Sequence, residues 1–193
     1  DCLLALDDYF DKFDFDKNDV YETILECGQY SGKQYMIPRD YNHVVTFYDK
    51  KMFDEKGVEY PKLGWTWEDF IEVAYKFPES VGSGKNKVYT KRACVPALEW
   101  GATAPIILKS LGATFLSEDG KSANFNTPGT VKALKEIKKL CDDGVFVNAF
   151  YNDLGGFGYG KVAMCFQTRS NLTNILSTLD NDPNRLGVTS FPV

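Results

Sequence analysis

The chain has 193 residues, of which 44% are hydrophobic and 25% charged, a balance typical of a folded globular protein rather than a disordered segment. Its formal net charge of -5 offers no basic surface for nucleic acid, so we expect no nucleic-acid partner. The apolar runs, such as 104–108 and 145–147, are far shorter than the ~20 residues that a membrane helix needs. The length suits one sizeable domain, or one domain with an appendage.

The first part of the chain predicts two short helices, at 2–13 and 19–29, separated by an acidic turn. A strand signal at 32–38 ends in a proline. The sequence VVTFY at 44–48 is rich in β-branched and aromatic residues, which is typical of a buried strand. A short helix at 50–56 follows, stopped by a glycine.

The middle of the chain carries a strong helix-start signal. Thr66 can cap a helix, and Asp69 follows three positions later, as in a capping box. Pro78 ends this helix. The Ser-, Gly- and Asn-containing stretch 78–87 predicts a loop, and 88–95 is expected to be extended.

The remaining elements alternate between helix and strand. A helix is predicted at 96–111, with a kink at Pro105, and a hairpin turn at 118–121. Thr127 begins a further helix that ends at Gly144. The last expected elements are a strand at 161–166, a helix at 170–179 and a strand at 186–191. Strands alternating with helices predict a layered α/β domain.

The sequence contains no recognisable catalytic apparatus. His43 is the single histidine, it precedes an apolar strand, and there is no G-x-S-x-G elbow. Asp14, Asp16 and Asn18 resemble the start of a calcium loop but lack its later ligands. Phosphate-binding glycine motifs are absent, so neither a cofactor nor a metal is expected. The five cysteines are widely spaced and best interpreted as free thiols, although one disulfide stays an open alternative. They are Cys2, Cys27, Cys94, Cys141 and Cys165.

Several short motifs occur in an order that resembles a known family. They are GKQYMIP at 32–38, YDKKMF at 48–53, WTWEDF at 65–70, the segment 111–144, and FGYGKVAM at 157–164. Each motif is weak alone, but their order and spacing are specific and span most of the chain. The chain resembles the extracellular solute-binding proteins of the carbohydrate ABC importer type (family 1, maltose-binding-protein-like).

Two positions depart from the family pattern. Asp49 stands where the family usually has asparagine. After Met164, the family often has Gly-x-Trp or Gly-Ser-Trp, whereas this chain has 167–170 as QTRS. The second departure removes a common platform on which a sugar ring stacks.

The resemblance implies a fold and a place in the cell. It implies a periplasmic-binding-protein type II-like lobe, in which helices flank a mixed sheet. Residues 1–37 would be lead-in and crossover segments, and 38–193 the second, C-terminal lobe of a two-lobe receptor whose other lobe is largely missing. The full-length protein would lie outside the cytoplasm, as a cell-surface lipoprotein or periplasmic protein, with membrane attachment only through an anchor missing from this chain.

The resemblance also implies a function. The lobes would close on a small-molecule solute, expected to be a carbohydrate, and present it to ABC permease transmembrane subunits. Two other hypotheses stay open: a receptor of the same fold for a peptide, polyamine or anion, and a small α/β hydrolase. Because the sequence shows no nucleophile or acid–base pair, we expect no enzyme and no catalytic residues.

The expected ligand face consists of loops that follow strands, since ligands of open α/β sheets lie outside the carboxyl ends of the strands. Trp100 could equally be a core residue; as a ligand residue it would stack on a sugar. The full set of predicted ligand-binding residues is Asp40, Asn42, Glu99, Trp100, Arg169 and Ser170.

Overall fold

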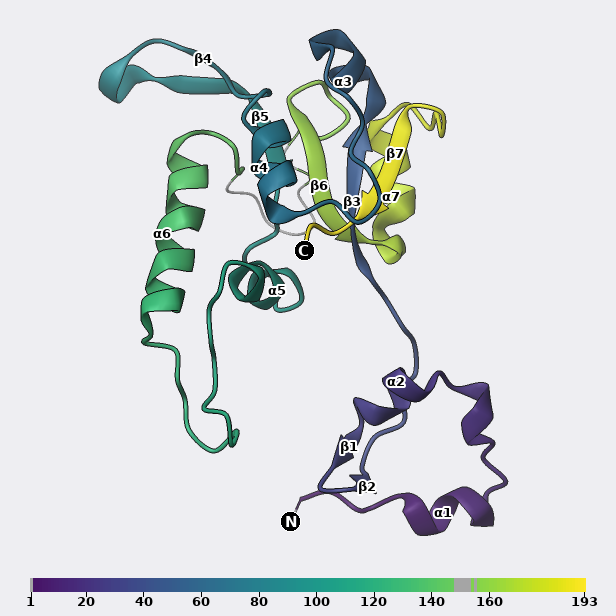
Figure 1. The fold of residues 1–193 in the computed structure, drawn as a ribbon. Coiled ribbons are helices and arrows are strands. Elements are labelled where there is room, and N and C mark those ends of the chain that lie inside the picture. The colour runs from purple at the N-terminus through teal and green to yellow at the C-terminus, as the bar shows by residue number, and fades with distance from the viewer. Residues whose placement is uncertain (1, 148–153, 155) are drawn as a thin grey trace. The chain divides into compact units, whose positions relative to one another are not determined.

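The computed structural model describes residues 2–147, 154 and 156–193, and divides into two units, 1–42 and 43–193 (Figure 1). The first unit contains only short elements. They are α1 (Asp7–Lys12), the 3-10 turn η1 (Lys17–Asp19), α2 (Glu22–Glu26), β1 (Gln29–Tyr30) and β2 (Lys33–Gln34). The helices expected at 2–13 and 19–29 and the strand expected at 32–38 are therefore shorter than predicted.

A tight hairpin organises the first unit. β1 and β2 pair antiparallel, with Gln29 opposite Gln34, around Ser31 and Gly32, which both have positive φ. This turn twists in the sense that antiparallel strands require. The buried Gln34 side chain donates from Nε2 to the carbonyl of Leu25 at 2.8 Å, which ties the hairpin to α2.

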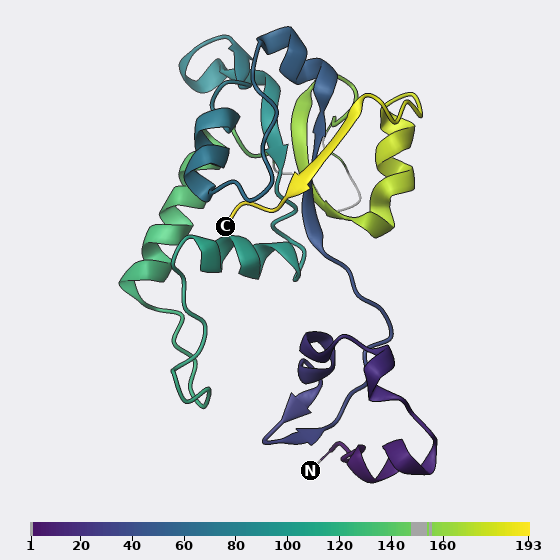
Figure 2. The same ribbon diagram turned by 45° about the vertical axis from the view of Figure 1, so that its right-hand side comes forward.

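The second unit is a five-stranded mixed sheet with helices on both faces (Figures 1 and 2). The strand order is β4-β5-β6-β3-β7. The strands are β3 (Val44–Asp49), β4 (Glu79–Val81), β5 (Val88–Val95), β6 (Val162–Thr168) and β7 (Leu186–Ser190). The helices are α3 (Lys50–Lys56), α4 (Trp67–Ala74), α5 (Thr103–Ser110), α6 (Pro128–Asp142) and α7 (Leu172–Thr178), with short 3-10 turns η2 (Gly84–Asn86) and η3 (Arg169–Asn171). The predicted mixed α/β fold is confirmed.

The central strand, β6, is buried on both faces of the sheet. Every residue of β6 is buried, as expected for a strand with helices on both faces. On one face, Phe166 packs among aromatic rings that include Phe70 of α4, with ring centroids 5.3 Å apart. On the other face, Cys165 lies in a cluster with Ile175 of α7.

Two helix-start predictions are confirmed in atomic detail. The Thr66 Oγ1 accepts from the Asp69 backbone N–H at 3.1 Å, and the Asp69 carboxylate accepts from the Thr66 N–H at 2.8 Å. Thr127 caps α6 in the same manner, accepting from the N–H of Thr130 at 3.2 Å. These caps satisfy N–H groups that a helix leaves without internal partners.

The helix expected at 96–111 is wrong in its first seven positions. α5 begins at Thr103, and the residues before it form a turn in which Ala97 has φ of 49°. A left-handed residue cannot continue a right-handed helix. Pro105 consequently lies in the first turn of α5, where its missing N–H costs nothing, and the expected kink is not needed.

The stretch 78–87, expected to be a loop, contributes an edge strand. β4 pairs antiparallel with β5, with Val81 opposite Val88. Three residues are too short a run for alternation to reveal a strand. Among the described residues, every helix falls short of the length and apolarity needed to cross a bilayer.

Candidate functional site

The carboxyl ends of β5 and β6 meet at one edge of the sheet. The two strands are parallel neighbours, with Cys94 opposite Met164 and Val95 opposite Cys165. β5 ends at Val95, and β6 continues to Thr168. The loops that leave these strands therefore emerge on the same side, which is where open α/β sheets bind ligands.

Two further segments reach this edge because β3 pairs antiparallel with β6, and β7 pairs antiparallel with β3. Val44, the first residue of β3, lies opposite Thr168, and Ser190, the last residue of β7, lies opposite Val45. The chain enters the second unit and leaves β7 at the edge where β6 ends. The exposed His43 precedes Val44 at this edge.

The loop after β5 carries two of the predicted ligand residues. Glu99 is exposed and Trp100 is half-buried. The Trp100 backbone N–H donates to the Ala97 carbonyl at 3.1 Å, which closes a turn before α5 begins. Residues 97–100 therefore lie outside α5, which begins only at Thr103.

The turn after β6 carries two more predicted ligand residues. Arg169 and Ser170 are both exposed and belong to η3. The Ser170 hydroxyl shares a 2.6 Å hydrogen bond with the hydroxyl of Thr168. Among the described residues Arg169 makes no ion pair, so its guanidinium has donors to offer a ligand.

The other two predicted residues, Asp40 and Asn42, lie in the first unit. Both are exposed. The Asp40 carboxylate accepts from Arg39 Nη2 at 2.6 Å and from Arg39 Nε at 3.0 Å. The structure thus brings four of the six predicted residues to one sheet edge. The ligand role of all six stays a prediction.

Sequence reasoning missed the buried polar residues that support this edge. Gln167, Thr168 and Asn171 are at most 5% exposed, although they surround the turn that carries Arg169. The Asn171 Oδ1 accepts from Asn174 Nδ2 at 2.6 Å, while its own Nδ2 has no hydrogen-bond partner among the described residues. A glutamine and a threonine closing the apolar run VAMCF were the available signal, because buried polar groups need a reason.

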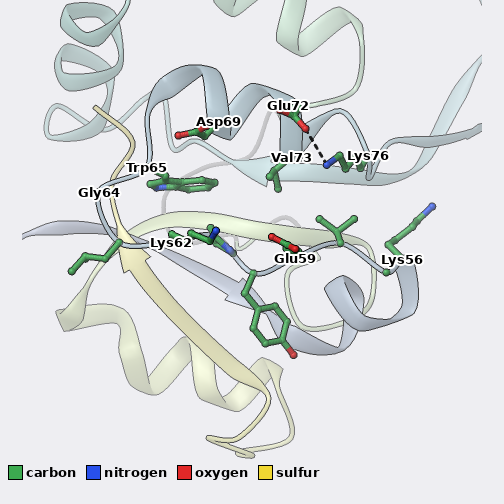
Figure 3. A pocket seen from close by; sticks show the side chains of 14 residues that line it. Lys56, Glu59, Lys62, Gly64, Trp65, Asp69, Glu72, Val73 and Lys76 are labelled. Atoms are coloured by element: carbon green, nitrogen blue, oxygen red, sulfur yellow. Dashed lines mark hydrogen bonds and ion pairs between the residues drawn. The ribbon is translucent and has the colours of Figure 1, made fainter.

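A separate groove of about 780 Å³ lies between the 56–65 loop and α4 (Figure 3). Its apolar lining includes Val58, Trp65 and Val73, and its rim carries three lysines and three carboxylates. Two of these charges, Glu72 and Lys76, form an ion pair at 3.4 Å. None of the four predicted residues of the second unit lines this groove.

Metal binding and disulfide formation receive no support from the described part of the chain. No cluster of His, Cys, Asp and Glu suited to a metal ion occurs among those residues. All five cysteines are free. Cys94 and Cys165 lie on neighbouring strands but in opposite core clusters, so their thiols point to different faces of the sheet.

Comparison with known proteins decides the family. The bacterial extracellular solute-binding protein family matches residues 1–192, almost the whole chain. This chain belongs to that family. Two similar proteins, from Brucella abortus (strain 2308) and Brucella suis biovar 1 (strain 1330), are described as binding proteins. Each is 27% identical to this chain over 182 residues, covering 91% of the chain and 42% of the relative.

Solved structures share the fold of this chain. An ABC substrate-binding protein from Listeria monocytogenes, in complex with cycloalternan, is 27% identical with a TM-score of 0.67, covering 96% of this chain and 46% of that protein. The GacH receptor of Streptomyces glaucescens is 20% identical with a TM-score of 0.72, covering 99% and 47%. MalE from Xanthomonas citri is 18% identical with a TM-score of 0.72, covering 98% and 48%.

The chain spans less than half the length of these relatives. Family membership implies an extracytoplasmic location for the solute-binding protein. The family and the solved neighbours are binding proteins rather than enzymes.

Proposed function

We propose that this chain is part of the receptor of an ABC importer and binds a sugar or oligosaccharide. The observation that carries the proposal is the convergence of Glu99, Trp100, Arg169 and Ser170 on the edge where β5 and β6 end. An indole face, a carboxylate, a guanidinium and a hydroxyl are suited to the apolar face and the hydroxyl groups of a sugar ring.

The proteins with the same fold support a carbohydrate ligand. The Listeria protein binds cycloalternan, the Streptomyces receptor binds acarbose, and a MalE from Bdellovibrio bacteriovorus binds maltotriose. The proposal for this chain is a carbohydrate ligand, and not any one of these sugars.

The proposed mechanism requires a second lobe, in the rest of the full-length protein, that closes on the solute opposite residues 38–193. A binding pocket typically buries roughly 70–90% of a small ligand, which one open sheet edge cannot do. Closure would produce the form that the permease recognises. In this proposal the full-length protein lies outside the cytoplasm, either in the periplasm or on the cell surface through a lipid anchor.

A second candidate is a phosphate-bearing solute. UgpB from Mycobacterium tuberculosis, solved in complex with glycerophosphocholine, has the same fold with a TM-score of 0.71 and 18% identity. Arg169 favours this candidate, since an exposed guanidinium without an ion pair among the described residues suits a phosphate.

A thermal-shift screen of the full-length receptor separates these candidates. The panel consists of maltose, maltotriose, acarbose, tagatose and glycerophosphocholine. A ligand that binds only the folded protein raises Tm by mass action, equivalent to about 2.7 kcal/mol at a concentration of one hundred times Kd. A rise with a sugar supports the proposal, a rise with glycerophosphocholine alone supports the second candidate, and no rise with any member contradicts both.

A further inference from the structure

The turn that presents Glu99 and Trp100 has an unusual backbone. Ala97 is fully buried and has φ of 49°, in the left-handed region that residues with a Cβ seldom adopt. Such a conformation persists only where neighbouring contacts impose it, and it tends to occur at functional sites. Neighbouring contacts must therefore hold Ala97 in this conformation.

Thr103 provides the contacts that hold Ala97 in this conformation. Its side chain is fully buried, and its hydroxyl donates to the Ala97 carbonyl. The same hydroxyl lies 3.3 Å from the Trp100 carbonyl, which also accepts the Thr103 backbone N–H at 3.1 Å. One residue thus contacts both the first and the last carbonyl of the turn 97–100.

Thr103 is itself held by a rigid element. It is the first residue of α5, and Ile107, one helical turn later, is fully buried in the main core cluster. A side chain fixed to a packed helix is a firmer support than one on a loop. The hydroxyl therefore ties the turn at the ligand edge to the core.

We propose that Thr103 is a positioning residue of the solute site, which holds the turn 97–100 so that Glu99 and Trp100 are presented to the ligand before it arrives. This rests on the proposed function, because Thr103 acts only through these two residues. A turn that is already ordered does not lose that conformational freedom on binding, and affinity rises accordingly. Thr103 itself does not contact the solute.

The test compares Thr103→Val with Thr103→Ser in the full-length receptor. Valine keeps the shape and removes the hydroxyl, whereas serine keeps the hydroxyl. Thr130→Val is the matched control, since Thr130 is 1% exposed and its hydroxyl lies 3.3 Å from the Thr114 carbonyl, at the start of α6. If Thr103→Val does not fold, Thr103→Ala removes the same hydroxyl without adding bulk.

Two readouts are measured: affinity for the sugar of the panel that raises Tm most, and hydrogen exchange of the amides of Leu98, Glu99 and Trp100. We expect Thr103→Val to bind about 2- to 10-fold more weakly, the range that one hydrogen bond is worth, and to exchange these amides faster. Thr103→Ser should approach the wild type in both readouts, and Thr130→Val should change neither.

Unchanged affinity in Thr103→Val, or an equal loss in Thr130→Val, overturns the positioning role. If no sugar binds the wild type, the proposed function fails by itself. Hydrogen exchange of the amides of residues 98–100 then tests separately whether Thr103 holds the turn. Unchanged exchange of these amides in Thr103→Val would show that Thr103 does not hold it.

Discussion

Asp49 and Arg185 form an ion pair with two hydrogen bonds, at the end of the sheet opposite the candidate site. Arg185 Nε lies 2.9 Å from Asp49 Oδ1 and its Nη2 lies 2.6 Å from Oδ2. Asp49 is fully buried, and also accepts from the Lys51 N–H at the start of α3. The Asp49 carboxylate neutralises the Arg185 guanidinium, which an asparagine at this position would not do.

Replacing Asp49 with asparagine should therefore destabilise this protein. The Arg185 side chain, 15% exposed, would lose its counter-charge. We expect a loss of about 2–3 kcal/mol in the free energy of unfolding, measured by urea denaturation. In an Arg185→Met background the same Asp49→Asn change should cost much less. Equal costs in both backgrounds would show that the pair is not coupled.

Removing the Thr66 hydroxyl should weaken α4. Thr66→Ala abolishes one half of the capping box, and such a loss typically costs about 1 kcal/mol. Thr66→Ser retains the acceptor and should stay near the wild type. The exposed Thr173 makes no side-chain hydrogen bond with the described residues, so Thr173→Ala is the control. A drop in urea midpoint as large for Thr173→Ala would refute the cap as the cause.

Acid should destabilise the fold partly through Glu79. Lys56 and Lys91, with Nζ atoms 2.6 and 3.3 Å from Glu79 Oε1, lower the pKa of Glu79 below its ordinary value. A carboxylate with a lowered folded-state pKa stabilises the protein above the unfolded pKa of about 4.3. That contribution disappears as the pH falls through the folded value.

The measurement is Tm at pH 7 and pH 3. Glu79→Gln should show a smaller acid-induced drop than the wild type, because it has no carboxylate to protonate. Glu118→Gln removes an exposed carboxylate that makes no ion pair with the described residues. Its Tm should fall between pH 7 and pH 3 as much as that of the wild type. An unchanged drop in Glu79→Gln would exclude a role for this carboxylate in acid sensitivity.

Four of the five cysteines should react with iodoacetamide in two groups. Cys2 and Cys27 are exposed, whereas Cys94 and Cys165 are fully buried, and burial raises the pKa of both buried thiols. Only thiolates react, so mass spectrometry at pH 8 should find Cys2 and Cys27 alkylated first. Cys94 and Cys165 should react only after urea unfolding. Their alkylation at the same rate as Cys27 in the native protein would contradict the sheet arrangement.

Truncating Arg169 should weaken solute binding more than it weakens folding. A hydrogen bond to a charged group is worth about 1.5–3 kcal/mol, so Arg169→Ala should lower affinity roughly 10-fold or more by calorimetry. Its Tm should remain close to that of the wild type, because the side chain is exposed. Lys135→Ala removes an exposed cation on α6 and is the control. Retained affinity in Arg169→Ala would remove this residue from the site.

The sequence by itself determined the elements whose signals are local. The capping box at Thr66, the Thr127-Pro128 start of α6 and the β-branched strand 44–48 depend on neighbouring residues, and all three are confirmed. The ordered motifs also indicated the family, and the match over residues 1–192 confirms it.

Only the tertiary structure decided the strand order, the site edge and the start of α5. Strand order depends on pairings between distant segments, such as Val44 with Thr168, which no local pattern records. The 96–102 segment has the composition of a helix, yet the hydrogen bond from the buried Thr103 to Ala97 holds it in a turn. Tertiary contacts override a weak helix propensity because a buried carbonyl must find a donor. The parallel pairing of β5 with β6 brings the loops that carry residues 99–100 and 169–170 to one edge of the sheet.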